Sequence, residues 1–335
     1  MTPLISTKIR RNGCHISPQQ QIQYSITIQV FRLVETGLQG QAAAYGLVLV
    51  LLTLVWGINW PIMKFGVTGF PPLTFRTICM WLGLPVLGLF LVWRKVPFRI
   101  DRVHWRELAV LTVTNMFFWH TLAILAIQSL SSGRAAILGY TMPVFSALLG
   151  AAWFGQRLAG RAWFGVAAAA LGVVLLLWHE VSTLSGRPLG VFMMLVAAAT
   201  WALGTQLMRR TRIAHPTLAI SFWMTVATTL WMTLLAVVFE RDAWTLPSAP
   251  IWGAIVYNAI GVFAFAQVVW LMLARDLPPI ASTLSVMFIP VLGVFSGAWW
   301  LGEVLHWQDW TAVVLVMLAI ATVLWPTRPV SADPR

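Results

Sequence analysis

Long apolar segments dominate the chain, and polar residues gather in the short stretches between them. A membrane-spanning helix needs about 20 consecutive, mainly apolar residues, and ten segments approach or reach that length. They are Ala43–Val67, Leu73–Trp93, Leu108–Gln128, Ala135–Phe154, Ala162–Leu177, Leu189–Met208, Leu218–Phe239, Ile251–Leu273, Ile280–Leu301 and Trp310–Trp325. Turn-forming residues such as Pro71-Pro72 and Pro278-Pro279 separate them. The pattern predicts an all-α membrane protein with ten transmembrane helices.

The composition agrees with a membrane environment. Hydrophobic residues make up 59% of the 335 residues and charged residues only 10%, whereas roughly a quarter of the residues in a soluble domain are charged. The 20 tryptophans fit the same environment, because indole rings favour the headgroup level of a bilayer. We therefore expect a lipid bilayer to surround most of the chain.

The net charge of +12 raises the question of nucleic-acid binding. The basic residues lie between apolar segments rather than along one soluble face, which argues against nucleic acid as a partner. Cys14 and Cys79 lie in a polar tail and inside a predicted span, so neither a disulfide nor a metal pair is expected. The sequence predicts no metal site and no cofactor.

The distribution of basic residues predicts the orientation of the chain. With the N-terminus in the cytoplasm, 17 of the 22 Lys and Arg residues fall in cytoplasmic segments. The other five are Lys64, Arg76, Arg134, Arg187 and Arg241. Because cytoplasmic loops carry the excess of positive charge, both termini are expected in the cytoplasm, with the protein in a cell inner membrane.

The polar residues 1–41 predict a disordered cytoplasmic tail, and residues 327–335 a second cytoplasmic tail. The first tail has no apolar core, so it is neither a signal peptide nor a span. One hypothesis is that the working protein begins near Gln39, at a non-AUG start, and that residues 1–38 are not native. The intact mass of the native protein would decide this.

An internal repeat divides the chain into two halves. At a constant offset of 147 residues, Pro143 aligns with Pro290, and a run of seven further identities includes Gly155 with Gly302 and Trp163 with Trp310. Such a run without a gap indicates a duplicated unit. We therefore predict two five-helix repeats, residues 42–178 and 188–326.

An odd number of spans in each repeat has a topological consequence. The second repeat must enter the membrane in the opposite sense to the first. The charges agree, since Arg157 and Arg161 follow the fourth span and no Lys or Arg follows the ninth. Inverted repeats are typical of secondary transporters, in which both halves enclose a central cavity and expose it alternately to each side. The short fifth and tenth segments are expected to be supports outside that cavity.

Several motifs resemble those of the drug/metabolite transporter superfamily, in particular proteins with two EamA-type domains. They are Trp56-Gly57 followed by Lys64, the run Pro71 to Arg76, the run Pro143 to Gly155, and Pro290 through Gly302-Glu303. The resemblance covers residues from about 42 to 326. It implies ten helices around a central cavity and export of small metabolites, amino acids or drugs. Gln156 stands where the family usually has glutamate, which puts in doubt any mechanism that needs a carboxylate in both halves.

Charges at membrane depth are the first candidates for a transport role, because burying them is costly. All ten acids fall in loops, tails or the last turn of a span, so no buried carboxylate is available as a proton carrier. His120 lies a little past the middle of the third span and would suit proton coupling. Alternatively, it is a neutral histidine that forms a hydrogen bond to a neighbouring helix. Gln128 lies on the same ridge of the helix.

Lys64 and Arg76 lie near the predicted outer ends of the first two spans, with no acid close in sequence. One interpretation is that both extend outward to the headgroups. The other is a cationic mouth that receives an anionic group of the substrate. Asn59, one turn deeper in a helix loosened by Pro61, could add a hydrogen bond.

The remaining candidates are polar or aromatic residues at depth. They are Trp56, Asn115, Tyr140, Trp201, Gln206, Asn258 and Gln267. The amides either join helices or line the cavity, and the tryptophans either pack or meet an amphipathic or aromatic substrate. Pro143 and Pro290 are candidate hinges.

The leading hypothesis is a secondary transporter that exports a small organic solute. A membrane-embedded lipid or prenyl transferase is the alternative from another class, but it would need clustered Asp, Glu or His residues at a membrane face, and the sequence shows none. A non-transporting scaffold is the third possibility. No nucleotide-binding loop is present, which argues against ATP-driven pumping by this chain alone.

Overall fold

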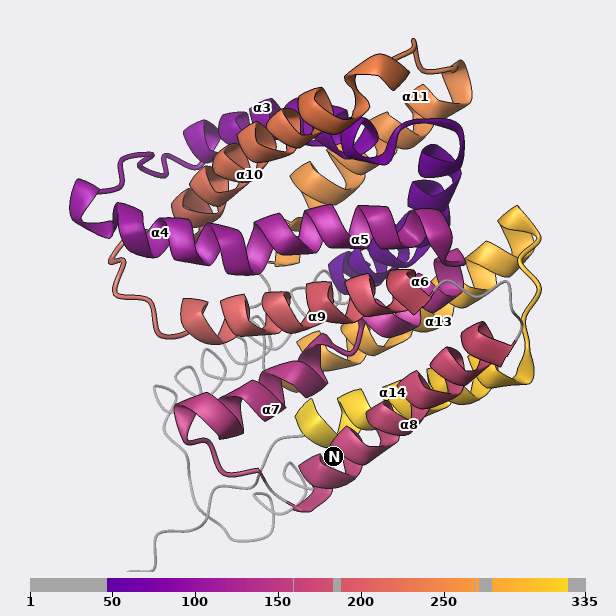
Figure 1. The fold of residues 1–335 in the computed structure, drawn as a ribbon. Coiled ribbons are helices and arrows are strands. Elements are labelled where there is room, and N and C mark those ends of the chain that lie inside the picture. The colour runs from indigo at the N-terminus through magenta and orange to yellow at the C-terminus, as the bar shows by residue number, and fades with distance from the viewer. Residues whose placement is uncertain (1–46, 159, 183–187, 268, 271–278, 325–335) are drawn as a thin grey trace, which may run out of the picture. The chain divides into compact units, whose positions relative to one another are not determined.

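The structure is a computed structural model that describes residues 47–158, 160–182, 188–267, 269–270 and 279–324. The predicted tails, Cys14 and the proposed start near Gln39 lie outside the described residues. Within the described ranges the chain forms helices and connecting loops and no strand, as the apolar pattern predicts. Figure 1 shows these helices, coloured from indigo near the N-terminus to yellow near the C-terminus.

The first half begins with a helix over Leu47–Gly69 and continues with α3 over Pro72–Trp93. The third span is built from four consecutive pieces: η1 (Arg102–His104), α4 (Trp105–Leu111), η2 (Thr112–Phe117) and α5 (Phe118–Ser129). The remaining helices are α6 (Ser132–Gly139), α7 (Met142–Phe154) and α8 (Gly160–Ser182).

The second half begins with α9 (Pro188–Met208) and α10 (Thr217–Glu240), which η3 (Arg241–Ala243) extends by one turn. Its third span contains α11 (Ala249–Val256) and η4 (Tyr257–Ala266). The last two helices are α13 (Pro279–Leu301) and α14 (Trp307–Leu324).

Seven helical stretches are long and apolar enough to cross a membrane, as judged by length and composition over the described residues. Three shorter apolar stretches, Gly160–Leu176, Phe288–Leu301 and Trp307–Thr322, complete a set of ten. Each of the ten corresponds to one predicted segment. The chain is therefore an all-helical, multi-pass membrane protein.

The repeat seen in the sequence recurs in the local backbone. Gly155 and Gly302 have φ angles of 64° and 65° and end α7 and α13. After each glycine, the next amide donates to a carbonyl six residues back: Gln156 N to Gly150 O at 2.9 Å, and Glu303 N to Gly297 O at 3.4 Å. Glycine is the preferred residue at such a left-handed helix end, because it adopts positive φ without strain.

The third span of each half contains a π-helix. The offset of 147 residues places η2 (Thr112–Phe117) at residues 259–264, inside η4 (Tyr257–Ala266). A π-helical turn is rare and is frequently found at functional sites. The two wide turns therefore mark equivalent places in the two halves.

The residues from Val50 onward form one compact unit, in which the main helix contacts join the first half to the second. α3 packs against α10 and η4, α5 against α9, α6 against α13, and α8 against α14. In Figure 1, α8 and α14 lie along each other, as do α3 and α10. The fifth helices of the two halves, α8 and α14, thus pack on each other, and their expected role as supports outside a central cavity stays a prediction.

The two candidate hinge prolines have different surroundings. The fourth span is interrupted at Tyr140 and Thr141, and Pro143 lies in the first turn of α7, where a proline needs no amide partner. Pro290 lies inside α13, which continues through it. The fourth span is thus interrupted just before Pro143, whereas α13 is continuous at Pro290. A hinge role for either proline stays a prediction.

Close packing of α9 on η2 gives a first test of the fold. A Cβ atom on Gly204 would lie 2.6 Å from the Asn115 Cα and 2.7 Å from its N, both backbone atoms that cannot rotate away. We expect Gly204→Ala to destabilise the protein by about 1–3 kcal/mol and to lower its unfolding temperature in detergent. Gly253→Ala in α11 is the matched control, because nothing lies within 4 Å of that position. The control should be neutral or stabilising, and equal behaviour of the two variants would contradict the packing.

Candidate functional site

Arg76 is a charged residue buried inside the bundle. It lies in the first turns of α3 and is only 4% exposed. Its Nη2 atom donates to the Met63 sulfur at 2.7 Å, and its Nε atom has no hydrogen-bond partner among the described residues. Within the same part of the chain Arg76 takes part in no ion pair. Its guanidinium lies over the Phe263 ring, 5.6 Å from the ring centroid.

The Arg76 side chain points into the bundle rather than outward. The Phe263 ring that it covers also packs against Gly83, about two turns further along α3 from Arg76. A side chain extended toward the headgroups would point away from Gly83. The interpretation that Arg76 reaches outward to the headgroups is therefore wrong, because its guanidinium is held against an aromatic ring in the interior.

His120 contacts the same phenylalanine. Its imidazole centroid is 5.3 Å from the Phe263 centroid, the residue is 8% exposed, and its Nδ1 atom has no hydrogen-bond partner among the described residues. Two helices of the first half, α3 and α5, thus bring an arginine and a histidine to one residue of η4 in the second half. We call Arg76, His120 and Phe263 the polar site.

Helix capping holds Arg76 in place. Glu240, the last residue of α10, accepts hydrogen bonds from the amides of Leu73 and Thr74 at 2.9 and 2.7 Å, and from the Thr74 hydroxyl at 2.8 Å. The Trp244 indole donates to the same hydroxyl at 2.9 Å. A carboxylate is favourable at a helix N-terminus, where amides lack intrahelical partners. The cap fixes the first turn of α3 and hence the starting point of the Arg76 side chain.

An aromatic group lies beside the polar site. The Trp60 and Tyr140 rings meet edge to face at 6.4 Å, and the Trp119 and Trp201 rings lie 5.3 Å apart. Both Trp60 and Trp119 approach Gly139. Trp60 precedes Met63, the Arg76 partner, by three residues, so both occupy one face of the first helix. Trp119 directly precedes His120 in the chain. The four rings, Trp60, Trp119, Tyr140 and Trp201, are called the aromatic group below.

Two asparagine side chains inside the bundle each have a carbonyl oxygen that accepts no hydrogen bond from the described residues. Asn59 is 6% exposed and Asn258 is fully buried, and the Oδ1 atom of each has no partner among the described residues. The Asn258 amide donates to the Ala254 carbonyl at 3.1 Å. Buried polar atoms are nearly always paired, so unpaired ones need an explanation.

Two other predicted amides join helices. Asn115 donates from η2 to the Trp201 carbonyl at 3.3 Å and to the Thr205 hydroxyl at 3.4 Å, both on α9. Gln206 donates to the Ser146 carbonyl and hydroxyl at 2.7 and 2.9 Å and accepts from Arg210 at 2.7 Å. Their hydrogen bonds match the interpretation that such amides connect helices.

The last three sequence candidates are Lys64, Trp56 and Gln267. Lys64 donates to the carbonyls of Ile127 and Gln128 at 3.1 and 3.0 Å and so caps the C-terminal end of α5. Trp56 packs against Trp270 at 5.7 Å. Gln267 follows η4 and is half-buried. The structure thus separates Lys64 from Arg76, which the sequence had grouped as one cationic mouth.

The buried and half-buried acids among the described residues form hydrogen bonds or ion pairs outside the polar site. Glu303, which follows α13, accepts from the Ser132 amide at 2.6 Å, the Ser132 hydroxyl at 2.9 Å and the Gly133 amide at 3.2 Å, all at the start of α6. Asp309 forms an ion pair with Arg134 at 2.7 Å. Glu107 accepts from Thr211 and Arg212 between α9 and α10. Like Glu240, these acids hold helix ends and loops.

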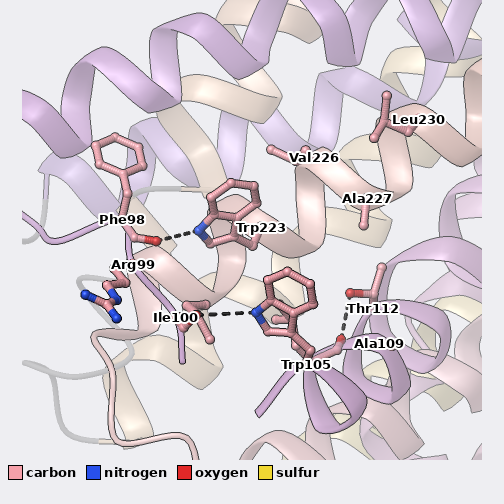
Figure 2. Close-up of a pocket in the computed structure, with 11 residues that line it drawn as sticks. Phe98, Arg99, Ile100, Trp105, Ala109, Thr112, Trp223, Val226, Ala227 and Leu230 are labelled. Atoms are coloured by element: carbon pink, nitrogen blue, oxygen red, sulfur yellow. Dashed lines mark hydrogen bonds between the residues drawn. The ribbon is translucent and has the colours of Figure 1, made fainter. Parts of the chain in front are cut away.

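The polar site is not open to any of three cavities found among the described residues. One cavity, of about 520 Å³, lies between α4 and α10 (Figure 2). The indole N–H groups that flank it are used by backbone carbonyls, Trp223 to Phe98 at 2.6 Å and Trp105 to Ile100 at 3.3 Å. This leaves an almost wholly apolar wall that offers little to a polar solute. The other two cavities, of about 430 and 380 Å³, lie near Phe70 and Ser129.

A family comparison decides the class of the protein. The family model described as "EamA-like transporter family" matches residues 44–178 and again residues 188–325, which is most of the chain. The chain belongs to the EamA-like transporter family. It is therefore a membrane transporter, which confirms the resemblance seen in the sequence motifs.

Individual relatives of this EamA-like chain agree. It is 23% identical over 277 residues to the uncharacterized transporter YoaV of Bacillus subtilis, covering 81% of this chain and 92% of YoaV. It is 26% identical to the uncharacterized inner membrane transporter YedA of Escherichia coli, covering 84% and 92%. It is 24% identical to a probable amino-acid metabolite efflux pump of E. coli, covering 82% and 93%. A solved structure titled "Crystal structure of protein" matches with a TM-score of 0.61 at 20% identity, covering 84% of this chain and 97% of that one, which supports the fold alone.

In this EamA-like protein, sequence reasoning missed Phe263 of the polar site and Met63, the hydrogen-bond partner of Arg76. Phe263 looks like any apolar residue of a span, and only the structure shows that it contacts both Arg76 and His120. Met63 was likewise part of a motif without a role. The π-helices had no signal in the sequence pattern of one chain. Once one π-helix is known, the offset of 147 residues gives the place of the other.

The cap on α3 predicts a stability effect. Glu240→Gln keeps the shape of the side chain but removes the charge that the Leu73 and Thr74 amides face. We expect a loss of about 1 kcal/mol and a lower unfolding temperature in detergent. Asp242→Asn is the control, because that side chain is 99% exposed. An unchanged unfolding temperature for Glu240→Gln would show that the cap does not hold α3.

Proposed function

We propose that this EamA-like protein is a secondary transporter that exports small organic solutes across the inner membrane by alternating access. The observation that carries the proposal is the polar site. A transporter needs groups inside the bilayer that interact with a solute or a coupling ion, and intramembrane ionisable residues are the first candidates. Arg76 and His120 lie where both halves of the chain meet, at Phe263.

The contacts between helix ends support inverted repeats. Glu240 at the C-terminal end of α10 caps the N-terminal end of α3, so these two second spans run in opposite directions. Glu303 after α13 caps the start of α6, so the fourth spans also run in opposite directions. In an inverted repeat each helix is antiparallel to its counterpart, and two pairs fit that rule. This arrangement would enclose a central path between residues 42–178 and 188–326.

The enclosed position of the polar site supports alternating access. Because Arg76 and His120 are only 4% and 8% exposed, a solute would need a rearrangement of the halves to arrive there. Besides their apolar helix packing, the halves are joined by polar contacts such as Glu303 with Ser132 and Asp309 with Arg134. Contacts of this kind can separate and re-form as two halves rock about a central site. Pro143, beside the break in the fourth span, would be the hinge in this scheme.

Family membership favours transport over the two other hypotheses, a lipid or prenyl transferase and a scaffold. The names of two relatives support the location and the direction that we propose. YedA is named an inner membrane transporter, and another relative a probable amino-acid metabolite efflux pump. Amino acids, metabolites and drugs are accordingly the compounds to screen first, with both termini of the chain in the cytoplasm.

The inverted topology can be tested by cysteine labelling. In a variant without native thiols, Arg157→Cys and Val304→Cys place single cysteines after the fourth and ninth spans. We expect an impermeant maleimide to label Val304→Cys in intact cells and Arg157→Cys only after permeabilisation. Val304 is 76% exposed, so its thiol will be accessible. Labelling of both positions from the same side would end the inverted-repeat proposal.

Proton coupling through His120 can be tested in proteoliposomes. A screen of amino acids, carboxylates and cationic dyes, with and without a pH gradient, identifies a transported compound. We expect His120→Ala to remove the response of its transport to the pH gradient, because no described carboxylate lies at the polar site to carry the proton instead. His104→Ala, in η1 outside the bundle core, is the control. A response that survives in folded His120→Ala would exclude the role.

A further inference from the structure

We propose that the polar site selects solutes with a net negative charge, such as a carboxylate joined to an apolar or aromatic body, over neutral and zwitterionic analogues. This inference rests on the proposed transport function and names its substrate class. It goes beyond the family comparison, because the relatives include a pump named for amino-acid metabolites, and free amino acids are zwitterions.

The first step is the uncompensated charge of Arg76. An arginine keeps its charge at neutral pH, and its planar guanidinium presents five donors that match a carboxylate. In this structure one donor faces a methionine sulfur and the Nε atom has no partner among the described residues. A thioether is a weak acceptor, so most of the hydrogen-bonding capacity of a buried cation is unused. An incoming anion would supply both the acceptors and the opposite charge.

The second step is the absence of a described acid for an ammonium group. Of the six acids whose side chains the structure describes, four hold helix ends, loops or Arg134. The other two, Asp101 and Asp242, have side chains 57% and 99% exposed. A zwitterion would bring its ammonium group into a buried site beside a guanidinium. Burying an unpaired charge is strongly unfavourable, so an α-ammonium group would offset the gain at Arg76.

The third step concerns the rest of the solute. The aromatic group begins one turn away from Met63 on the first helix and includes the residue before His120. Four large rings from both halves therefore border the cationic end of the site. Aromatic side chains favour stacking or edge-to-face contact with a ring of the solute. A guanidinium with aromatic rings beside it complements an aromatic acid.

Three indole compounds with nearly the same body test this selectivity. Indole-3-acetate is an anion, indole-3-acetamide is neutral, and free L-tryptophan is a zwitterion. Binding to the purified full-length protein is measured by ligand-dependent thermal shift, and transport in proteoliposomes. We expect the acetate to bind at least about tenfold more tightly than the amide or tryptophan, the size of effect that a hydrogen bond to a charged group supplies.

Substitutions at Arg76 assign the effect to the polar site. Arg76→Gln should remove the preference for the acid over the amide, and it should fold, since deleting an isolated buried charge removes an unfavourable burial. Arg76→Lys keeps the charge without the planar fork and should retain the preference at weaker affinity. It also covers the case in which the glutamine variant fails to fold. Arg241→Gln is the matched control, because that arginine side chain is 71% exposed.

Equal binding of the three compounds by the wild type, no binding of the acid, or an unchanged preference in Arg76→Gln would overturn the inference. A wild type that binds in the expected order but transports none of the screened compounds would instead overturn the proposed function. Transport without preference for the acid would leave the transporter and remove the anion site. The two failures are thus distinct.

Discussion

The free amides at helix N-terminal ends are the constraint on which this structure depends. Inside a bilayer a backbone N–H group has no water to bind, so each buried helix end must find acceptors within the protein. In this chain the acceptors for α3 and α6 are carboxylates of the other half, Glu240 and Glu303. Each of these carboxylates ties the end of one helix to the start of another that runs the opposite way. The caps therefore determine how the two halves meet as well as where the helices begin.

This use of carboxylates leaves the interior with positive charge. Every described acid that is buried or half-buried holds a helix end, a loop or Arg134, and none lies at the polar site. Arg76 begins at a capped helix end but extends inward over Phe263. The same interaction that makes the start of α3 stable thus places a guanidinium where no acid of the described ranges forms an ion pair with it. A site for an anionic solute follows from the arrangement of the acids as much as from the arginine itself.

The apolar pattern predicted the helices well because residues next to each helix end determine where the helix begins and ends. Leu73–Trp93 and Leu189–Met208 were each within one residue of α3 and α9, since prolines mark both starts. The features that it missed depend on tertiary contacts. The interruption before Pro143 and the π-helices change hydrogen bonds without changing hydrophobicity. The direction of Arg76 depends on Phe263, which is nearly 190 positions away in the printed sequence.

The same reasoning separates Arg76 from Lys64. Both cations lie near the end of an apolar segment, so sequence alone treats them alike. Lys64 reaches two carbonyls at the end of α5, which are free because a helix leaves its last carbonyls without amide partners. Arg76 has no such helix end within reach and meets a sulfur and a ring instead.

Gln156 stands where the family usually has glutamate, and the hydrogen-bond donors available at helix ends explain this difference. Gln156 and Glu303 follow the equivalent glycines Gly155 and Gly302. Each side chain lies against the glycine six residues earlier, Gly150 for Gln156 and Gly297 for Glu303. Glu303 uses the amide and hydroxyl of Ser132 and the amide of Gly133. At the offset of 147 residues Ser132 aligns with Pro279, which has neither an amide hydrogen nor a hydroxyl. A carboxylate at position 156 would lack two of these three donors, so an uncharged amide suits that position better. The halves are alike in backbone, and they differ in charge where the partner helix differs in the donors that it offers.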